Sequence, residues 1–343
     1  MGADRGRSPA GAPAPNIACA VAILRAGGLV AFPTETVYGL GADASNPAAV
    51  ARIFAAKGRP ADHPLIVHLA SSSQLSSWSA FVPPLALVFA KACWPGPLTL
   101  VLRRAAHVPD AVTGGRPTVG LRVPAHPLAL ELLSEFGGGI AAPSANRFGA
   151  VSPTTAAHVR EELGDRVDLV LDGGPCDVGV ESTIVDLSGE DGDVAILRPG
   201  GLPRERLEAL ADHPIPIRHG GSVRAPGMLE SHYAPAARVL LVPPESQPER
   251  AAELRGRGLR VGVIAFAGGG EAAPGGGGEA PDASLVDLGA SEEEAARHLY
   301  RALRDLDRNG CDVILAWPPE ERGLGLAVAD RLRRAAASSR ETG

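Results

Sequence analysis

Residues 29–41, Leu-Val-Ala-Phe-Pro-Thr-Glu-Thr-Val-Tyr-Gly-Leu-Gly, give the clearest single indication of the architecture. The apolar run Leu29–Phe32 predicts a short buried strand. Because proline is not tolerated in the middle of a sheet, we expect the chain to leave the sheet at Pro33 and to present the hydroxyls of Thr34 and Thr36 at the carboxyl end of the strand. Ligands of open α/β sheets bind at that edge. The segment is either part of a binding site or a structural turn, and its own pattern does not separate the two.

Predicted helices and strands alternate along the residues around this segment. Asn16 is a predicted N-cap for a helix that ends before Gly27, and Asn46 caps a second helix that has Pro47 in its first turn and ends at Lys57. Apolar runs indicate further strands at 64–70, 97–103, 119–123, 140–142, 167–171, 183–187 and 194–197. Helical patterns lie between them at 84–93, 127–136 and 152–163. This alternation predicts an α/β fold in which layers of helices cover a mixed sheet.

The length of 343 residues exceeds the size at which a single core usually keeps growing, so two domains are expected. We predict a disordered lead-in at 1–15, a first domain at 16–212, a Pro-, Gly- and His-rich linker at 213–236 and a second domain at 237–337. In the second domain, strand patterns at 238–242, 260–266 and 311–317 alternate with helical ones, among them a helix opened by the Ser291-x-x-Glu294 capping box and a final helix at 325–336. This pattern predicts a small doubly wound, Rossmann-like domain with a Gly-rich loop at 268–278.

The composition restricts the class of protein. The net charge is −6, from 33 basic and 39 acidic side chains, which argues against a protein that coats nucleic acid but leaves room for a local basic cleft. The four cysteines are scattered without a C-x-x-C pair, so they indicate neither a zinc site nor a disulfide framework and favour a reducing compartment. The sequence has no apolar run of about eighteen residues, the length of a spanning helix. We therefore expect a cytoplasmic protein.

Cationic side chains occur where predicted helices and strands end. Lys57-Gly-Arg-Pro60 closes a helix, where cations often only complement the helix dipole, yet the glycine and the proline make a rigid loop suited to polyphosphate. Arg122 lies inside an apolar strand, so its guanidinium needs an anionic partner from the protein or from a substrate. His68 also lies in a strand, where a lone histidine is more often a satisfied core residue than a ligand.

Hydroxyl and amide groups occupy further strand ends. Ala141-Ala-Pro-Ser-Ala-Asn146 leaves a strand through a proline, and Glu181-Ser-Thr183 and Leu197-Arg-Pro-Gly200 repeat the pattern of a polar group at a strand end. Ser144 lacks the G-x-S-x-G elbow of hydrolases, and the sequence shows neither a metal cage nor a nucleophile–base pair. Such a set of residues is typical of a site that works by positioning and electrostatics, as nucleotidyl and phosphoryl transfer do.

Several of these segments also occur, in this order, as the motifs of one family. The chain resembles the YrdC/YwlC-type threonylcarbamoyl-AMP synthases, in the longer form that carries an extra C-terminal domain. The resemblance covers residues 16–337 and rests on Thr34-Glu-Thr-Val-Tyr-Gly-Leu-Gly41, Lys57-Gly-Arg-Pro60, Trp94-Pro-Gly-Pro-Leu-Thr99, Arg122-Val-Pro124, Pro143-Ser-Ala-Asn146, Gly179-Val-Glu-Ser-Thr183, Ala225-Pro-Gly-Met228 and His232-Tyr-Ala-Pro235. It implies a YrdC-like twisted mixed sheet flanked by helices.

The resemblance also implies an activity, which is to make L-threonylcarbamoyladenylate and pyrophosphate from L-threonine, bicarbonate and ATP. The product feeds formation of N6-threonylcarbamoyladenosine in tRNA, so the implied partners are small-molecule substrates and the downstream threonylcarbamoyl transferase machinery, with tRNA met only indirectly. The residues implied to bind ATP are Lys57, Arg59, His63, Thr118, Ser144, Asn146, Ser152, Arg198 and Tyr233, the last in a linker that folds over the nucleotide. Those implied to bind threonine are Thr34, Thr36, His68, Arg122, Ala142 and Ser182. Lys57 and Arg59 are the implied catalytic cations, and Mg²⁺ is expected on the phosphates of ATP, with no metal ligands from the protein.

One position departs from the family pattern, and two other functions stay open. Position 63 is His where the family usually has Asn; because an imidazole titrates near neutrality, we expect an ATP affinity that depends on pH. An RNA-binding module is disfavoured by the acidic net charge. An enzyme that makes carbamoyl-adenylate for a biosynthetic pathway would release pyrophosphate without threonine. The second domain lacks a phosphate loop, which favours a lid or regulatory role for it.

Overall fold

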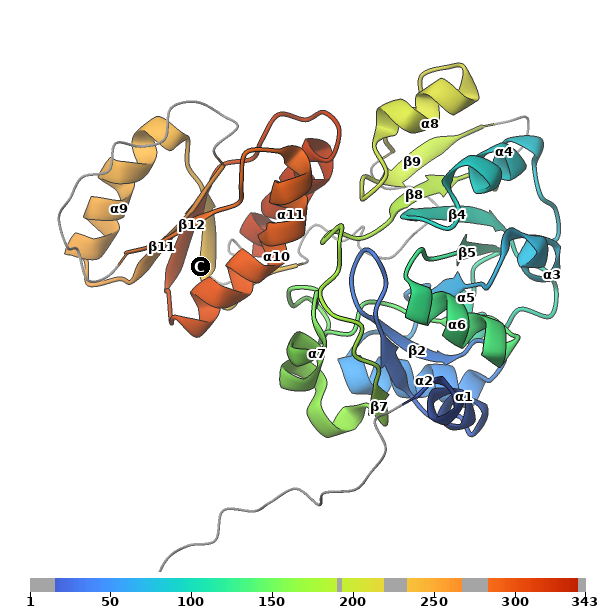
Figure 1. Ribbon diagram of the computed structural model, residues 1–343. Helices are drawn as coiled ribbons and strands as arrows, with labels where there is room; N and C mark the ends of the chain where they lie inside the picture. The colour runs from blue at the N-terminus through green and yellow to red at the C-terminus, as the bar shows by residue number, and fades with distance from the viewer. Residues whose placement is uncertain (1–15, 190–192, 219–232, 267–282, 339–343) are drawn as a thin grey trace, which may run out of the picture.

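The computed structural model describes residues 16–189, 193–218, 233–266 and 283–338. The described chain forms two α/β units side by side, each built around its own sheet (Figure 1). The predicted lead-in at 1–15, the Gly-rich loop at 268–278 and the Ala225–Met228 motif of the linker lie outside the described residues.

The larger unit contains a nine-stranded mixed sheet in the order β7-β1-β2-β6-β3-β5-β4-β8-β9. Its strands are β1 Val30–Phe32, β2 Gly39–Asp43, β3 Ile66–His68, β4 Leu98–Arg103, β5 Thr118–Arg122, β6 Ile140–Ala141, β7 Leu169–Val170, β8 Thr183–Asp186 and β9 Ala195–Arg198. Strand β1 runs antiparallel to β2 but parallel to β7, and β3 runs parallel to β5 but antiparallel to β6. The mixed sheet predicted from the alternating pattern is confirmed.

Helices cover both faces of this sheet. Helices α1 (Ile17–Arg25) and α6 (Pro127–Phe136) pack with Val30 and Phe32 of β1 on one face, while Leu29 and Ala31 point into the core on the other face, because side chains alternate along a strand. That second face carries α2 Pro47–Lys57, α3 Leu75–Trp78, α4 Pro84–Cys93, α5 Asp110–Thr113 and α7 Ala156–Leu163, and α8 Arg204–Ala211 packs beside α4. The side chains of Asn16 and Asn46 cap α1 and α2, as their positions predict.

One strand of the larger unit was not predicted, and the start of one helix was misplaced. Residues 33–38 turn, and the chain then re-enters the sheet as β2, whose Gly39 pairs with Phe32. Strand β2 was not predicted because its Gly-Leu-Gly sequence has low strand propensity. The helix expected from Ser152 begins only at Ala156, since the Thr155 side chain accepts the His158 N–H as the N-cap. Ser152 is left in an extended connection, which places its hydroxyl beside the pocket described below.

The smaller unit is a four-stranded parallel sheet in the order β10-β13-β11-β12. Its strands are β10 Arg238–Leu241, β11 Val261–Ala265, β12 Ala283–Asp287 and β13 Val313–Ala316. Helix α9 (Gln247–Gly256) covers the outer side, and α10 (Glu292–Arg308) and α11 (Gly325–Ser338) lie on the side that faces the larger unit (Figure 1). The doubly wound arrangement is confirmed, but β12 was not predicted. The capping box is half formed, because Ser291 accepts the Glu294 N–H while the Glu294 carboxylate accepts the N–H of Ala290.

Candidate active site

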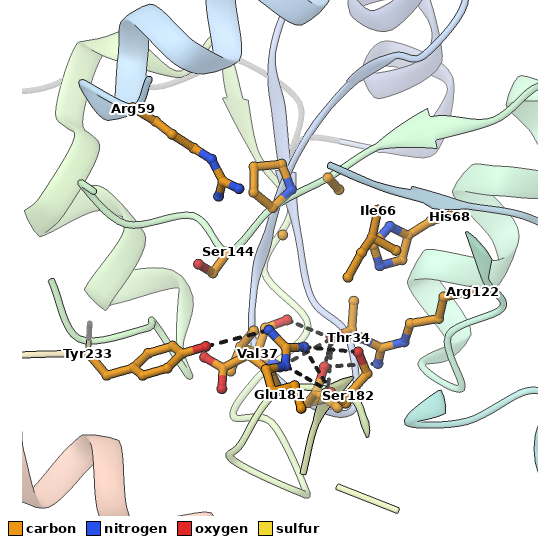
Figure 2. A pocket seen from close by; sticks show the side chains of 15 residues that line it. Thr34, Val37, Arg59, Ile66, His68, Arg122, Ser144, Glu181, Ser182 and Tyr233 are labelled. Atoms are coloured by element: carbon orange, nitrogen blue, oxygen red, sulfur yellow. Dashed lines mark hydrogen bonds between the residues drawn. The ribbon is translucent and has the colours of Figure 1, made fainter. Parts of the chain in front are cut away.

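A pocket opens at the strand ends of the larger sheet, and its wall reaches the smaller unit. The described residues that line it come from eight short stretches of the chain: Thr34, Thr36, Val37, Gly39, Arg59, Ile66, His68, Arg122, Ala142, Pro143, Ser144, Glu181, Ser182, Arg198 and Tyr233. Arg59 enters from the side of α2, and Arg122 and His68 enter from the opposite side (Figure 2). The pocket therefore has two ends, each with a buried arginine.

The turn after β1 supplies one wall, and its threonines are held by the turn itself. The Thr34 hydroxyl donates to the Val37 carbonyl at 2.6 Å and accepts the N–H groups of Thr36 and Val37 at 3.2 Å. The end of the turn is held against the segment that follows β6, because the N–H of Leu40 donates to the carbonyl of Pro143 at 2.8 Å. Thr34 and Thr36, the pair predicted at this strand end, both line the pocket.

Arg122 has a protein partner that sequence reasoning did not identify. Its Nη2 donates to Glu35 Oε1 at 2.7 Å and to the Thr36 hydroxyl at 2.8 Å. The other Glu35 oxygen accepts the N–H of Ala125 at 2.9 Å. The exposed fractions of the two side chains are 5% and 9%, so this is a buried ion pair. The prediction that Arg122 needs an anion is met within the protein, although its Nε lacks a hydrogen-bond partner among the described residues.

His68 lies next to Arg122 on the paired strand and is neutral over the physiological range. Burial, assisted by the positive charge of Arg122, lowers the pKa of His68 to about 3. Its ring meets the edge of Phe32 at a centroid distance of 6.0 Å. Its Nδ1 is buried and without a hydrogen-bond partner within the part of the chain that the structure describes. A buried polar atom that is left unpaired in a residue lining a pocket indicates a place for a ligand.

The two cations of the predicted loop, Lys57 and Arg59, have different positions and different contacts. Arg59 lines the pocket, its Nη2 donates to the Pro64 carbonyl at 3.0 Å, and its Nε has no partner among the described residues. Burial lowers the pKa of Arg59 to about 10, which leaves it charged at neutral pH. Lys57 does not line the pocket; its Nζ donates to the carbonyls of Ser144 and Asn146 at 2.5 Å. Burial and the nearby charge of Arg59 lower the pKa of Lys57 well below its usual value.

Five residues implied to bind ATP, Lys57, His63, Thr118, Asn146 and Ser152, are not among the described residues that line the pocket. Asn146 donates from Nδ2 to the carbonyls of Arg147 and Ala150, so its amide shapes the loop. His63 stands edge-on to Phe148 at 5.4 Å between ring centroids. Ser144, Arg198 and Tyr233 do reach the pocket, as do all six residues implied to bind threonine.

The strand ends of β8 and β9 supply the opposite wall. Arg198 donates from Nε and Nη2 to the carbonyl of Ser182 at 3.2 and 2.8 Å, and its Nη1 lies 3.5 Å from the Tyr233 hydroxyl. The Ser182 hydroxyl is 2.8 Å from that of Thr99, a residue of the quoted motifs to which no role was assigned. Tyr233 has a φ of 63°, a left-handed conformation that is unusual for a bulky side chain and that turns its ring into the pocket.

Glu181 joins the pocket wall to the smaller unit. Its carboxylate accepts the Ser152 hydroxyl at 2.6 Å, the Tyr300 hydroxyl at 2.8 Å and the Nε of Arg331 at 2.8 Å. Burial opposes ionisation, but the charges of Arg331 and Arg198 outweigh it and lower the pKa of Glu181 to about 2. Sequence reasoning quoted Glu181 within a motif without a role and did not single out Tyr300 or Arg331. The helical pattern around these two gives no local sign that they reach the site.

The described residues contain neither a helix long and apolar enough to span a bilayer nor a group of three or more His, Cys, Asp or Glu side chains that could hold a metal ion. Among the described lining residues the single carboxylate is Glu181, and both its oxygens accept hydrogen bonds from protein donors. A pocket with arginines at both ends and hydroxyls between them, at the strand ends of an α/β sheet, defines an anion-binding α/β enzyme of the kind that handles nucleotides.

Comparison with known proteins makes this class specific. Residues 22–200 match the family Sua5_yciO_yrdC, described as "Telomere recombination", and residues 202–337 match Sua5_C, described as "Threonylcarbamoyl-AMP synthase, C-terminal domain". A threonylcarbamoyl-AMP synthase of Pyrococcus abyssi is 47% identical over 93% of this chain and 94% of its own length, and one of Bacillus subtilis is 45% identical over 94% and 93%. The crystal structure of P. abyssi Sua5 complexed with L-threonine matches with a TM-score of 0.85 at 45% identity, over 94% of each chain. The chain belongs to the Sua5/YrdC family of threonylcarbamoyl-AMP synthases.

Proposed function

We propose that this chain condenses L-threonine, bicarbonate and ATP into L-threonylcarbamoyladenylate and pyrophosphate. The observation that carries the proposal is the two-ended pocket, in which Arg122 and Arg59 enter from opposite sides (Figure 2). One end has the polar groups for a small amino acid, and the other has the cations for a polyphosphate.

At the amino-acid end, Arg122 meets the threonine carboxylate. The unpartnered Nε of Arg122 leaves it a donor for a second anion beside Glu35. The Thr36 and Ser182 hydroxyls and the Ala142 backbone supply further polar contacts. His68, held neutral by burial, offers an unpartnered ring nitrogen and adds no positive charge next to the threonine amine. This end therefore suits a zwitterion whose amine must lose a proton before it reacts.

At the nucleotide end, Arg59 and Arg198 face the phosphates and Tyr233 covers the base or ribose. Ser144 contributes a hydroxyl from the loop between β6 and α7. Lys57 acts through this loop, because its Nζ donates to the carbonyls of Ser144 and Asn146 and so fixes the loop's position. Asn146 and Ser152 support the same wall through the contacts described above.

The reaction requires that the threonine amine and the α-phosphate of ATP lie next to each other between the two ends of the pocket. The neutral threonine amine adds to CO₂ formed from bicarbonate, and the hydroxide lost from bicarbonate takes a proton from the amine nitrogen, so that carbamate and water result. A carbamate oxygen then attacks the α-phosphorus of ATP in line, so that an oxygen–phosphorus bond forms as the bond to pyrophosphate breaks. Arg59 and Arg198 balance the charge that develops on the leaving group. Mg²⁺ on the ATP phosphates would supply further charge neutralisation, and Glu181, whose oxygens are already engaged, is not needed as a ligand.

The wider role follows from the product. A mixed anhydride of this kind is short-lived in water, so a threonylcarbamoyl transferase must consume it to form N6-threonylcarbamoyladenosine in tRNA. We place the reaction in the cytoplasm, where ATP, bicarbonate and tRNA occur together. The chain meets tRNA only through that transferase.

The test is pyrophosphate release that depends on both threonine and bicarbonate. Arg59→Ala should lower kcat/KM by about tenfold or more, because it removes charged hydrogen bonds of about 1.5–3 kcal/mol. Lys57→Ala should lower it by a similar factor, because the carbonyls of Ser144 and Asn146 lose their donor. Arg52→Ala is the matched control, since Arg52 lies on α2 together with Lys57 but forms an exposed ion pair with Asp168. Wild-type-like activity in both variants would contradict the assignment of the nucleotide end.

Two results would favour the alternative functions. Pyrophosphate release without threonine would favour the carbamoyl-adenylate enzyme, and salt-sensitive RNA binding without ATP turnover would favour the RNA-binding module.

A further inference from the structure

Two helices of the smaller unit reach the pocket of the larger one. Tyr300, on α10, donates its hydroxyl to Glu181, and Arg331, on α11, donates from Nε to the same carboxylate. Glu181 lines the pocket itself. Tyr300 and Arg331 are both fully buried, and they act on the pocket through a carboxylate that belongs to its wall.

The negative charge of Glu181 stands in the wall of a pocket that we propose binds the negatively charged phosphates of ATP. An ionised carboxylate in the wall would repel phosphate oxygens unless a cation compensated it. The low pKa of Glu181 keeps it ionised at neutral pH, and Arg331 and Arg198 are the cations responsible. Arg198 is itself a pocket residue, so it cannot serve Glu181 and the phosphates equally well.

Arg331 is placed to be this compensating cation and to hold a second pocket residue. Its Nη2 donates to the Pro199 carbonyl at 3.1 Å, and its Nη1 contacts Asp330 at 2.5 Å. Its guanidinium lies over the Tyr233 ring, 4.8 Å from the ring centroid, within the range of a cation–π contact. The Tyr233 and Tyr300 rings are stacked at 5.8 Å, so the same cluster fixes the ring that we place over the nucleotide. Arg331 is not among the described residues that line the pocket, and its three side-chain nitrogens contact protein groups, so Arg331 is a positioning residue.

We propose that Arg331, assisted by Tyr300, is a positioning residue for the nucleotide end of the pocket. Arg331 balances the charge of Glu181, so that Arg198 stays directed at the phosphates. It also holds the Tyr233 ring over the site through the cation–π contact. This inference rests on the function proposed above. It gives the smaller unit a definite task, which is to complete the nucleotide pocket.

The experiment compares KM for ATP with KM for threonine in Arg331→Met. Methionine fills a similar volume without charge, and Asp330 keeps Arg334 as a partner at 3.0 Å. We expect KM for ATP to rise about tenfold or more, because Glu181 then draws Arg198 away from the phosphates, while KM for threonine stays within about threefold. The control is Arg308→Met, which breaks the interdomain ion pair with Glu161 without touching the pocket and should leave both values unchanged.

The double variant Glu181→Gln, Arg331→Met separates charge compensation from simple domain attachment. The amide of Gln still accepts the Ser152 and Tyr300 hydroxyls but carries no charge, so KM for ATP should return to within about threefold of wild type. A structural role for Arg331 alone would predict no rescue, and the absence of rescue would overturn the proposal.

A second variant, Tyr300→Phe, and the activity of the wild type distinguish the remaining outcomes. If Arg331→Met does not fold, Tyr300→Phe removes one hydrogen bond to Glu181 and keeps the packing, and KM for ATP should rise about threefold with threonine unaffected. Equal rises in both KM values, or none, would overturn the inference. If wild type itself shows no threonine-dependent pyrophosphate release, the proposed function fails, which is a different result from an active wild type whose Arg331→Met variant matches Arg308→Met.

Discussion

Glu35→Gln tests the buried ion pair at the amino-acid end. In the wild type one Glu35 oxygen accepts from Arg122 and the other from the N–H of Ala125. An amide keeps the shape of the carboxylate but has one acceptor and one donor. Either the Arg122 guanidinium or the Ala125 N–H must then face an NH₂ group, and Arg122 loses its counter-charge in either case.

The magnitude follows from burial. Arg122 and Glu35 are 5% and 9% exposed, so water does not replace the lost partner. Leaving one charge of a buried pair uncompensated costs about 3–5 kcal/mol, which for a unit of this size lowers Tm by roughly 6–20 °C. Threonine should restore more stability to the variant than to the wild type, because its carboxylate supplies the missing anion, and saturation at about 100 times Kd contributes about 2.7 kcal/mol.

The assay is thermal unfolding of Glu35→Gln with and without threonine at neutral pH. Glu253→Gln is the control, since Glu253 pairs with Arg250 on the exposed surface and such pairs contribute about 0–1 kcal/mol. A Glu35→Gln variant as stable as the control would refute the reasoning on the buried pair. A threonine-induced shift smaller than that of the wild type would refute the assignment of Arg122 to the threonine carboxylate.

The remaining predictions concern pH and backbone space. His68 has its pKa lowered to about 3 in the folded protein, so between about pH 4 and 6.5 the unfolded chain binds the extra proton and acid destabilises the fold. His68→Gln should remove up to about 1.4 kcal/mol per pH unit of this slope, measured by urea unfolding, and an unchanged slope would contradict the buried neutral state. Gly200→Ala would place a methyl group 2.3 Å from the Glu181 carbonyl oxygen, so we expect little folded protein, whereas Gly256→Ala meets nothing within 4 Å and should express normally. Comparable yields of the two variants would contradict the packing at Gly200.

Much of the fold could be predicted because a sheet covered on both faces produces apolar runs with clear ends. The strand predicted at 29–32, the N-caps Asn16 and Asn46, and the parallel second sheet are examples. Strand β2 escaped prediction because its residues are mostly glycine and alanine, and it exists through pairing with β1. The start of α7 was misplaced because Ser152-Pro153 looks like a helix opening, while Thr155 is the residue whose side chain caps it.

The site was predictable where a residue acts from its own strand end. Thr36, His68 and Ser182 fall in the family motifs and line the pocket. Contacts between segments distant in sequence leave no local pattern. Neither the pairing of Arg122 with Glu35 nor the turning of Lys57 towards two backbone carbonyls could be seen without the fold.

The contact between Glu181 and Arg331 also has a consequence for biosynthesis. The two residues are 150 positions apart in the chain. A ribosome that adds about 5–20 residues per second makes Arg331 roughly 8–30 s after Glu181. During that interval the emerging larger unit can form its sheet, but its buried carboxylate lacks the guanidinium that completes the pocket. A nascent chain that has reached Tyr233 but not Arg331 would therefore hold every described pocket-lining residue, and we expect it to bind ATP more weakly than a chain that includes Arg331.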